Sequence, residues 1–377
     1  TSQEQAAELA WPGSIAIPGT SSRLKISGFA ELDVMYDNNA ILTPTSFVTS
    51  AIVTHDATAA QGEDGQLSFS TQPTRLSVEW RTPLSAEQRV RAFFAIDLFG
   101  TSSSASNSLR VREAYGELTK IVFGGDLLLG HTWSTVRNTL GVPSTLDFQG
   151  PNAAFGVRHP LVRWTRKLGA SPLALKLSVE APDKRAFDNA AALTGAPDGA
   201  LALAWNSDAI QVQASALLRH LRASVEDGAP ISALGWGANL SGRVYMPDLL
   251  EGDFWTFSVT YGRGIGGVLN DTPLDASYDP DSQQLETLPV LAYHVGYQHW
   301  WNTSLYSVVS YSDSWQDTFA FQAPTAYESG RYASLNLAFT PTPAWLFGVE
   351  GLYGSRKDKN GEQGWDARAQ FTSRVSF

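Results

Sequence analysis

Arginine is concentrated in one stretch of the chain, and its spacing there is regular. Arg-x-Arg pairs occur at Arg89 and Arg91 and again at Arg110 and Arg112, and Arg75 precedes both pairs. In a β-strand, residues i and i+2 share a face, so each pair would stack along one side of a strand. Guanidinium groups bind carboxylates through two parallel hydrogen bonds and keep their charge. The pattern predicts a positively charged wall on adjacent strands, with the two pairs as neighbours, that attracts anions.

The same arginines have a structural interpretation, in which each is paired with a carboxylate and only braces the strands. The acidic residues available for such pairing on the same predicted strands are Glu31, Asp33, Glu79, Asp97 and Glu113. Both interpretations stay open at this point, because an arginine row and the carboxylates that hold it upright often occur together.

The strands that would carry these residues are clearest at the C-terminus, over residues 364–377. Trp365, Phe371 and Phe377 fall on one face of this stretch, and Arg368 and Arg374 fall on the other. This period of two predicts a β-strand with one apolar and one polar face. A chain that stops on an aromatic residue resembles the closing strand of outer-membrane barrels. An edge strand of a soluble sandwich would show the same alternation.

Similar stretches recur along the chain and predict about 16 strands, an even number as in bacterial single-chain barrels. Their predicted ranges are 23–36, 66–81 (interrupted near Pro73), 88–99, 109–118, 121–133, 156–167, 173–180, 199–206, 209–221, 232–246, 254–263, 288–298, 303–312, 327–340, 344–355 and 364–377. Short and long connections alternate between them, with one short turn at 119–120. We therefore predict an all-β fold, a transmembrane antiparallel barrel with short periplasmic turns and long external loops.

Composition sets limits on the class of protein. The 377 residues include 12 Trp and no Cys, and only 17% are charged. No run approaches the roughly 18 apolar residues that a membrane helix needs. The net charge of -10 argues against a nucleic-acid partner. No HExxH motif or Cys cluster is present, so we expect no metal, no cofactor and no enzymatic activity.

The third long loop, residues 134–155, is apolar enough that it would not extend into water. We expect it to fold into the barrel and narrow it, with Pro143, Asp147 and Phe148 at the constriction and Arg137 as a further charged member. The alternative is an external loop packed between subunits.

If the barrel is correct, the strand arginines must point inward, because each would cost about 2–4 kcal/mol on the lipid side near the midplane.

Four segments resemble DcaP-type porins of Gram-negative outer membranes. Residues 130–134 (GHTWS), 143–151 (PSTLDFQGP) and 157–165 (VRHPLVRWT) are similar to the central segment of that family. Residues 25–37 (KISGFAELDVMYD) are similar to its first strand. The resemblance implies a 16-stranded homotrimeric channel in the bacterial outer membrane that takes up small anionic solutes, dicarboxylates in particular, past inward arginines.

Within the resembling motif, Arg158 and Arg163 match arginines of the family. They have opposite parity, so a regular strand cannot point both inward, and a bulge or the loop end must place Arg158. The family often carries an N-terminal periplasmic coiled coil. Residues 1–22 are expected to be a leader or a remnant of such a coiled coil, and residues 23–377 the barrel.

These observations favour an outer-membrane diffusion channel for small anions, with an arginine-lined constriction. The expected partners are membrane lipid and lipopolysaccharide, small anionic solutes and two further copies of the chain. A general porin of weak selectivity, with its arginines paired off, is the alternative within this class. A soluble β-sandwich binding protein is the alternative from another class.

Overall fold

The computed structural model describes residues 11–39, 41–54, 65–101, 107–183, 185–225, 229–246 and 252–377. Within these ranges, sixteen strands pair with their sequence neighbours in antiparallel fashion and close into a barrel. β22 closes the ring against β2, with Phe371 opposite Val34. Closure leaves no sheet edge between first and last strand, which a membrane-spanning sheet requires. None of the helices in the described part of the chain is long and apolar enough to cross a membrane.

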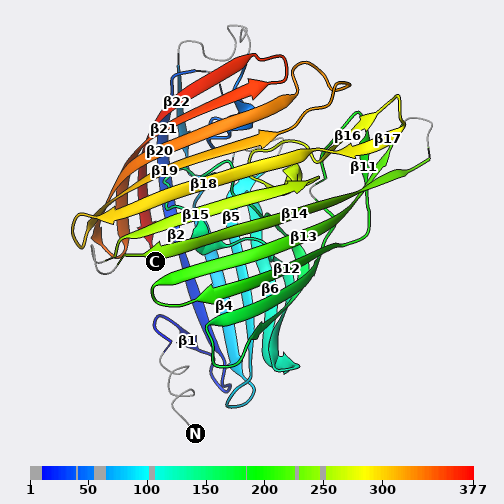
Figure 1. Ribbon diagram of the computed structural model, residues 1–377. Helices are drawn as coiled ribbons and strands as arrows, with labels where there is room; N and C mark the ends of the chain where they lie inside the picture. The colour runs from blue at the N-terminus through cyan, green and yellow to red at the C-terminus, as the bar shows by residue number, and fades with distance from the viewer. Residues whose placement is uncertain are drawn as a thin grey trace.

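The barrel strands run in chain order around the ring (Figure 1). They are β2 Arg23–Asp37, β4 Arg75–Pro83, β5 Arg89–Gly100, β6 Ser108–Val122, β7 Gly125–Trp133, β8 Arg158–Lys167, β9 Leu173–Glu180, β12 Asp198–Asn206, β13 Ile210–Ser224, β14 Ile231–Tyr245, β15 Phe254–Arg263, β18 Pro289–Trp300, β19 Leu305–Gln316, β20 Tyr327–Thr342, β21 Trp345–Asp358 and β22 Gln363–Ser376. In Figure 1, β12 to β22 form the front wall and the blue and cyan strands close the barrel behind.

Short elements add to this ring. β1 Ile15–Ala16 and β3 Gln66–Ser70 pair with the two ends of β2, and β11 Ala191–Leu193 pairs with β13. β10 Phe187–Asp188, β16 Ala276–Asp279 and β17 Gln284–Thr287 form a separate small sheet. The 3-10 turns are η1 Thr49–Ala51, η3 Thr139–Gly141 and η4 Gly266–Val268.

The inward and outward faces follow the alternation that the sequence predicts. In β2, Leu32 is 41% exposed on the outer face whereas Asp33 is 3% exposed on the inner face. In β22, Phe371 is 40% exposed and its neighbour Thr372 is fully buried. An outer surface made of such side chains needs an apolar surrounding, and a bilayer supplies one. The transmembrane barrel is thus confirmed in its strands and in their facing.

Connections differ at the two ends of the barrel, which we call the loop end and the turn end. The links 84–88, 168–172, 207–209 and 343–344 at the turn end are short, as predicted. Those at the loop end include loop 1 (38–65), loop 3 (134–157) and loop 6 (264–288). The last link, 359–362, is shorter than predicted because β21 and β22 stay paired as far as Lys357 and Gln363.

One predicted turn lies in the wrong place. β6 continues through residues 119–120 as far as Val122, and the chain reverses at Phe123 and Gly124. Both turn residues have positive φ, 47° and 69°, and glycine adopts such a conformation without strain. A register shift between Leu118 and Val122, with Lys120 also at positive φ, absorbs the extra residues. The alternation of side chains does not reveal such a bulge.

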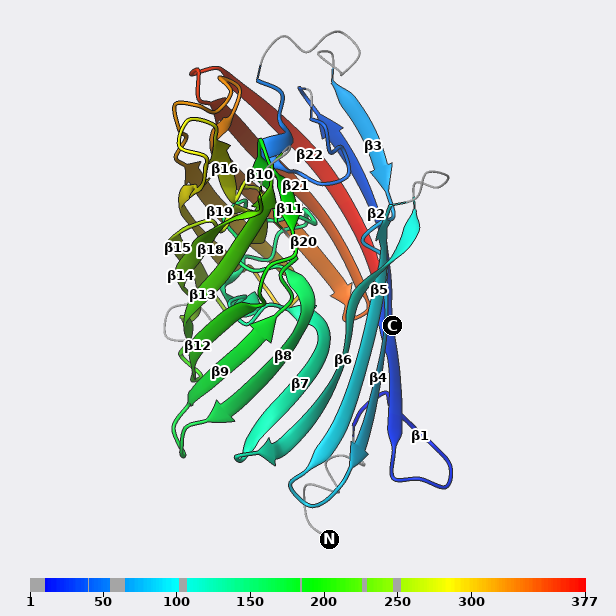
Figure 2. The same ribbon diagram turned by 90° about the vertical axis from the view of Figure 1, so that its right-hand side faces the viewer.

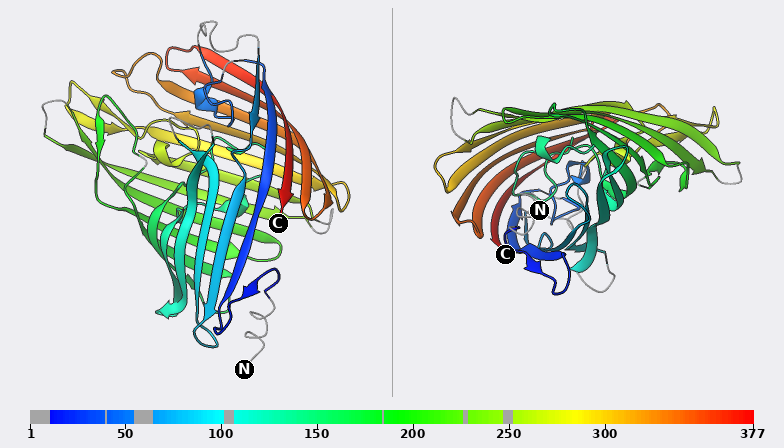
Figure 3. Two further views of the ribbon diagram at one scale, coloured as in Figure 1. Left: turned by 180° about the vertical axis from the view of Figure 1, so that it is seen from behind. Right: turned by 90° about the horizontal axis from the view of Figure 1, so that it is seen from below.

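Loops 1, 3 and 6 enter the barrel, so loop 3 is not the only inward loop among those described. Seen from below, the teal loop 3 and the blue loop 1 lie inside the ring of strands (Figure 3). Phe47 and Ile52 of loop 1 are buried against Tyr332 of β20. Ile265 of loop 6 packs in a cluster with Phe155 of loop 3. The inward third loop is confirmed, and the other two were not predicted.

The N-terminal part of the chain lies beside the turn end of β2 (Figure 2). Ile15 of β1 pairs with Leu24, and the Arg81 guanidinium lies 3.9 Å from the centre of the Trp11 ring. The leader expected at 1–22 is therefore attached to the barrel from Trp11 onward. Residues 1–10 of that expectation lie outside the described residues.

Candidate functional site

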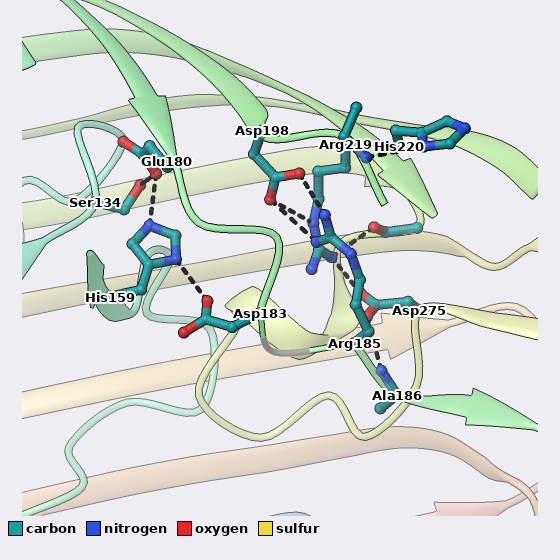
Figure 4. A network of polar contacts seen from close by, with 12 residues as sticks. Ser134, His159, Glu180, Asp183, Arg185, Ala186, Asp198, Arg219, His220 and Asp275 are labelled. Carbon is teal, nitrogen blue, oxygen red and sulfur yellow. Dashed lines mark hydrogen bonds and ion pairs between the residues drawn. The ribbon is translucent and has the colours of Figure 1, made fainter. Parts of the chain in front are cut away.

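Loop 3 begins from an anchored base. Ser134 Oγ donates a hydrogen bond of 2.7 Å to the Glu180 carboxylate on β9 (Figure 4). Thr135 N donates a second one to the same carboxylate at 2.8 Å. Ser134 N also donates to Val157 O at 2.8 Å, which closes the loop on itself where it leaves and re-enters the wall. The residues next to this base are therefore held in fixed positions.

From its base the loop crosses the inner face of the opposite wall. Asn138 donates to Ser241 O at 3.1 Å, and Asn336 donates to Ser144 O at 3.1 Å. Pro143 packs directly on β18, where a Cβ added to Gly296 would lie 2.7 Å from the Pro143 side chain. A glycine at this position is needed for so close an approach of loop and wall.

Asp147 fixes the tip of the loop. Its carboxylate accepts hydrogen bonds from Phe47 N at 3.1 Å and Gly150 N at 2.8 Å, and its own N–H donates to Glu350 at 2.6 Å. Burial raises the pKa of Asp147, and the charge of Arg368 opposes that rise. Asp147 is only 4% exposed, so it acts as an anchor between loop 3, loop 1 and the wall.

Phe148 follows Asp147 and joins the loop to the arginine-bearing strands. Its ring stacks on Phe99 of β5, with the ring centres 3.9 Å apart. The guanidinium groups of Arg112 and Arg110 lie 5.4 and 5.7 Å from its ring centre. The loop thus crosses the lumen and reaches the wall formed by β5 and β6.

Between loop 3 and this wall lies a cavity of about 390 Å³. Its cationic lining comes from three strands and the loop, namely from Arg75 of β4, Arg112 of β6, Arg374 of β22 and Arg137. Pro143, Asp147 and Phe148 line it from the loop side, as do Glu31 and Phe29 from β2. Four of the residues that line this cavity carry a guanidinium group.

Several of these arginines are neutralised by carboxylates. Arg110 and Arg112 both bind Asp97, at 2.7 and 2.6 Å, so two guanidinium groups share one acid. A register shift between β5 and β6 places both on the inner face together with Glu113. Arg374 forms an ion pair with Glu31.

Three other arginines have no such partner. Within the described ranges, Arg75, Arg137 and Arg158 form no ion pair, and each has a buried guanidinium nitrogen without a hydrogen-bond partner. Arg158 lies within electrostatic range of Arg112, Arg110 and Arg75. Burial lowers the pKa of Arg137 to about 10, which still leaves it charged at neutral pH. Positive charge is therefore in excess around the cavity.

The predicted grouping of the two Arg-x-Arg pairs is wrong. β5 and β6 are antiparallel, so Arg91 lies opposite Glu117 near the turn end while Asp97 lies opposite Arg110 near the loop end. Arg91 bonds Glu79 at 2.8 Å and Glu117 at 3.3 Å. Arg89 is exposed beside the 84–88 turn. Adjacent strands place residues side by side only when their register matches, and this register separates the pairs.

The two arginines of β8 occupy different positions, as their parity requires. Arg163 lies along the strand and donates to Trp133 O at 3.3 Å. Arg158 is the first residue of β8, directly after loop 3, and its guanidinium lies 4.8 Å from the centre of the Trp133 ring. Arg158 therefore reaches the lumen because it lies at the end of loop 3, which was one of the two predicted possibilities; the other was a bulge in the strand.

A second charged cluster lies at the loop end, outside the cavity (Figure 4). Arg185 and Arg219 are bound to Asp198 and Asp275, and all four side chains are almost completely buried. His159 contacts Glu180 at 2.7 Å and Asp183 at 2.9 Å through its two ring nitrogens. No group of three or more His, Cys, Asp or Glu among the described residues is arranged to hold a metal ion. These closed ion pairs tie loops and wall together.

Sequence reasoning missed the aromatic rings of the site. Phe29, Phe99 and Trp133 each contact one or more lumen arginines, yet each reads in the sequence as an ordinary strand aromatic. Only the position of Phe29 could have been predicted, because it lies on the same face of its strand as Glu31 and Asp33 and so points inward.

Comparison with protein families settles the class of this barrel. The model of the DcaP outer membrane protein family matches residues 4–377. The chain belongs to the DcaP family. It is therefore an outer-membrane channel protein of bacteria, with its turn end on the periplasmic side and its loop end outside. A search of curated proteins finds no match.

Solved structures of porins share the fold. The outer membrane channel DcaP of Acinetobacter baumannii superposes with a TM-score of 0.83 at 20% identity, covering 97% of this chain and 100% of that one. The anion-selective porin from Comamonas acidovorans gives 0.60 at 10% identity, covering 94% and 100%. OmpT of Vibrio cholerae gives 0.60 at 10% identity, covering 96% and 100%.

Proposed function

We propose that this channel conducts small anionic solutes and favours those with two carboxylates. The observation that carries the proposal is the set of half-buried guanidinium groups, on Arg75, Arg137 and Arg158, that form no ion pair with a described carboxylate and each contain one buried nitrogen without a partner. A buried charge without a partner is costly. A permeating carboxylate would relieve that cost while it replaces its own hydration by guanidinium hydrogen bonds.

The arrangement also provides several weak sites in succession, which conduction requires, because a solute held too tightly at one site does not leave. Arg137 and Arg158 lie at the base of loop 3, and Arg137 also lines the cavity that contains Arg75 and Arg112. Arg110 and Arg112 share one carboxylate and so retain hydrogen-bonding capacity for a solute. A dicarboxylate can contact two of these groups at once.

A general porin remains the second candidate, and one part of the lumen favours it. Toward the periplasmic end, Arg81 and Arg91 are neutralised by Glu79 and Glu117. If such arginine–glutamate ion pairs determined the electrostatic potential along the pore, chloride and potassium would pass with little discrimination.

The proposal is tested by the reversal potential in a planar bilayer under a KCl gradient. We expect chloride preference in the wild type and its loss in Arg75→Gln/Arg158→Gln. Arg89→Gln/Arg91→Gln removes the same charge near the periplasmic end and serves as the matched control, with a smaller shift expected. Cation preference in the wild type, or equal shifts in the two double variants, would contradict the arginine constriction and favour the general porin.

We further propose that the channel assembles as a homotrimer and that residues 23–377 form the barrel unit while residues 1–22 are a separate N-terminal segment. Support for the trimer comes from the family resemblance, and support for the boundary comes from β2, which begins at Arg23 and closes the ring against β22. Light scattering in detergent gives the mass of the assembly. A monomeric mass in mild detergent, with channel activity intact, would contradict the trimer.

A further inference from the structure

We propose that Trp133 is a positioning residue, which holds Arg137 and Arg158 as a two-guanidinium binding station for dicarboxylates on the external side of the constriction. This inference rests on the proposed function and names where a dicarboxylate first binds. Two guanidinium groups lie on the indole ring of Trp133, and neither forms an ion pair with a described carboxylate. Arg137 is 4.6 Å and Arg158 is 4.8 Å from the centre of that ring.

The indole ring holds the two guanidinium groups in position, as a carboxylate could, but it does not neutralise their positive charge. A guanidinium group stacks on an aromatic face by cation–π attraction and keeps its N–H edge free. Arg137 Nε and Arg158 Nη1 are buried and have no hydrogen-bond partner among the described residues. Because both groups lie on one ring, their central carbons are no more than about 9.4 Å apart. One dicarboxylate can span two groups so placed.

Glu180, an acidic side chain at the base of loop 3, is already engaged by other groups, and Asp97, whose charge acts on Arg158, is bound by Arg110 and Arg112. Glu180 accepts hydrogen bonds from Ser134 Oγ, Thr135 N and Ser178 Oγ, and it also contacts His159. Its four contacts leave it no capacity to neutralise an arginine in addition. Neither guanidinium group therefore forms an ion pair within the described ranges, and both keep a positive charge that attracts a dicarboxylate.

The backbone around Trp133 is fixed, so the station is preformed. Trp133 pairs with Arg158 across the β7–β8 ladder. Arg137 N donates to Ser134 O at 3.0 Å, and its Nη1 donates to Phe155 O at 3.5 Å. Gly156 has a φ of 94°, and a Cβ there would lie 2.8 Å from the Arg137 side chain. These contacts bring the two ends of loop 3 together with both arginines facing the same ring.

A matched control exists elsewhere in the lumen. Arg91 lies 5.5 Å from the centre of the Phe93 ring, but its guanidinium is bound by Glu79 and Glu117. Loss of that ring removes an aromatic–arginine contact of the same kind at a neutralised site. If Trp133 acts by presenting unneutralised arginines, Phe93→Leu and Trp133→Leu must differ.

The test is block of single-channel KCl current by succinate added from the external side. We expect Trp133→Leu to raise the half-blocking concentration about 5- to 30-fold, as loss of two cation–π contacts implies. Trp133→Phe should keep it within about 3-fold, and Phe93→Leu within about 2-fold. Chloride preference in the KCl gradient should persist in all three, because Arg75, Arg110 and Arg112 remain.

The charge-conserving variant Arg137→Lys/Arg158→Lys provides a second measurement if Trp133→Leu fails to fold. Lysine keeps the charge but lacks the planar group that stacks and binds carboxylate bidentately. Succinate block in this variant should weaken as in Trp133→Leu. Block at the wild-type concentration in either variant would overturn the station and leave the anion channel standing. Absence of both chloride preference and succinate block in the wild type would instead overturn the proposed function.

Discussion

The anchor at the tip of loop 3 makes a quantitative prediction. Asp147→Ala removes the acceptor of two backbone hydrogen bonds, from Phe47 N and Gly150 N. Hydrogen bonds to a charged group contribute about 1.5–3 kcal/mol each, so the two together amount to about 3–6 kcal/mol. Burial raises the pKa of Asp147, which shows that desolvation opposes part of this gain. We therefore expect a net loss of loop attachment near the lower end of this range, about 3 kcal/mol.

That loss is large enough to release the tip from the wall for a measurable fraction of the time. The chain contains no Cys, so a single Leu140→Cys in the exposed part of loop 3 accepts a spin label at one site. In Asp147→Ala we expect a mobile component in the spectrum and a noisier, larger single-channel conductance. The barrel itself should stay folded, because its strand pairing is untouched.

Asp147→Asn is the matched control, because it keeps the size of the side chain and removes its charge. Its amide offers one acceptor oxygen, so it can satisfy only one of the two N–H groups. It should give an intermediate effect on label mobility and conductance. If Asp147→Ala leaves both at wild-type values, the loop is held by its other wall contacts, such as Pro143 on Gly296, and the anchoring argument fails.

Three further predictions concern the loops and the constriction. Burial raises the pKa of Asp271 in loop 6 to about 6, so the folded protein binds this proton more tightly than the unfolded chain does. Stability of the folded protein should therefore fall as pH rises from about 4 to 7. The heat-modification midpoint should drop over that range in the wild type and drop less in Asp271→Asn, and equal slopes would argue against this carboxyl as the cause. Asp97→Asn frees the two arginines that share this acid, so chloride preference in a KCl gradient should increase if the variant folds; a decrease would show that Asp97 holds them in the orientation that anions need. Phe148→Ala removes the ring that stacks on Phe99, so single-channel conductance should rise, and an unchanged value would place the narrowest point elsewhere.

Much of the fold was predictable because the facing of each strand is a local property. In β22, every second side chain from Trp365 faces outward, and this follows from backbone geometry whatever the strand packs against. The inward entry of loop 3 was also predictable, since its apolar residues would not stay in water. The turn at Phe123 and Gly124 was missed because a bulge at Lys120 changes the count without a break in side-chain alternation.

The candidate site was only partly predictable, since it depends on distances between residues that are remote in sequence. The arginines at 75, 110, 112, 137 and 158 come together around the cavity and the loop base, as a list of inward arginines would suggest. Arg91 does not join them, because antiparallel register carries it to the periplasmic end and to Glu79. Nothing in the sequence distinguishes an Arg-x-Arg pair near one end of a strand from a pair near the other.

The sequence alone determined that this chain is a barrel, which faces of its strands meet lipid, and that its arginines point inward. These follow from a period of two and from the cost of charge in a bilayer, both of which act residue by residue. Only the tertiary structure decided which arginines keep a free guanidinium group. That outcome depends on whether a carboxylate, as at Asp97, or an aromatic ring, as at Trp133, lies within a few ångströms, and strand register and the path of loop 3 set those distances.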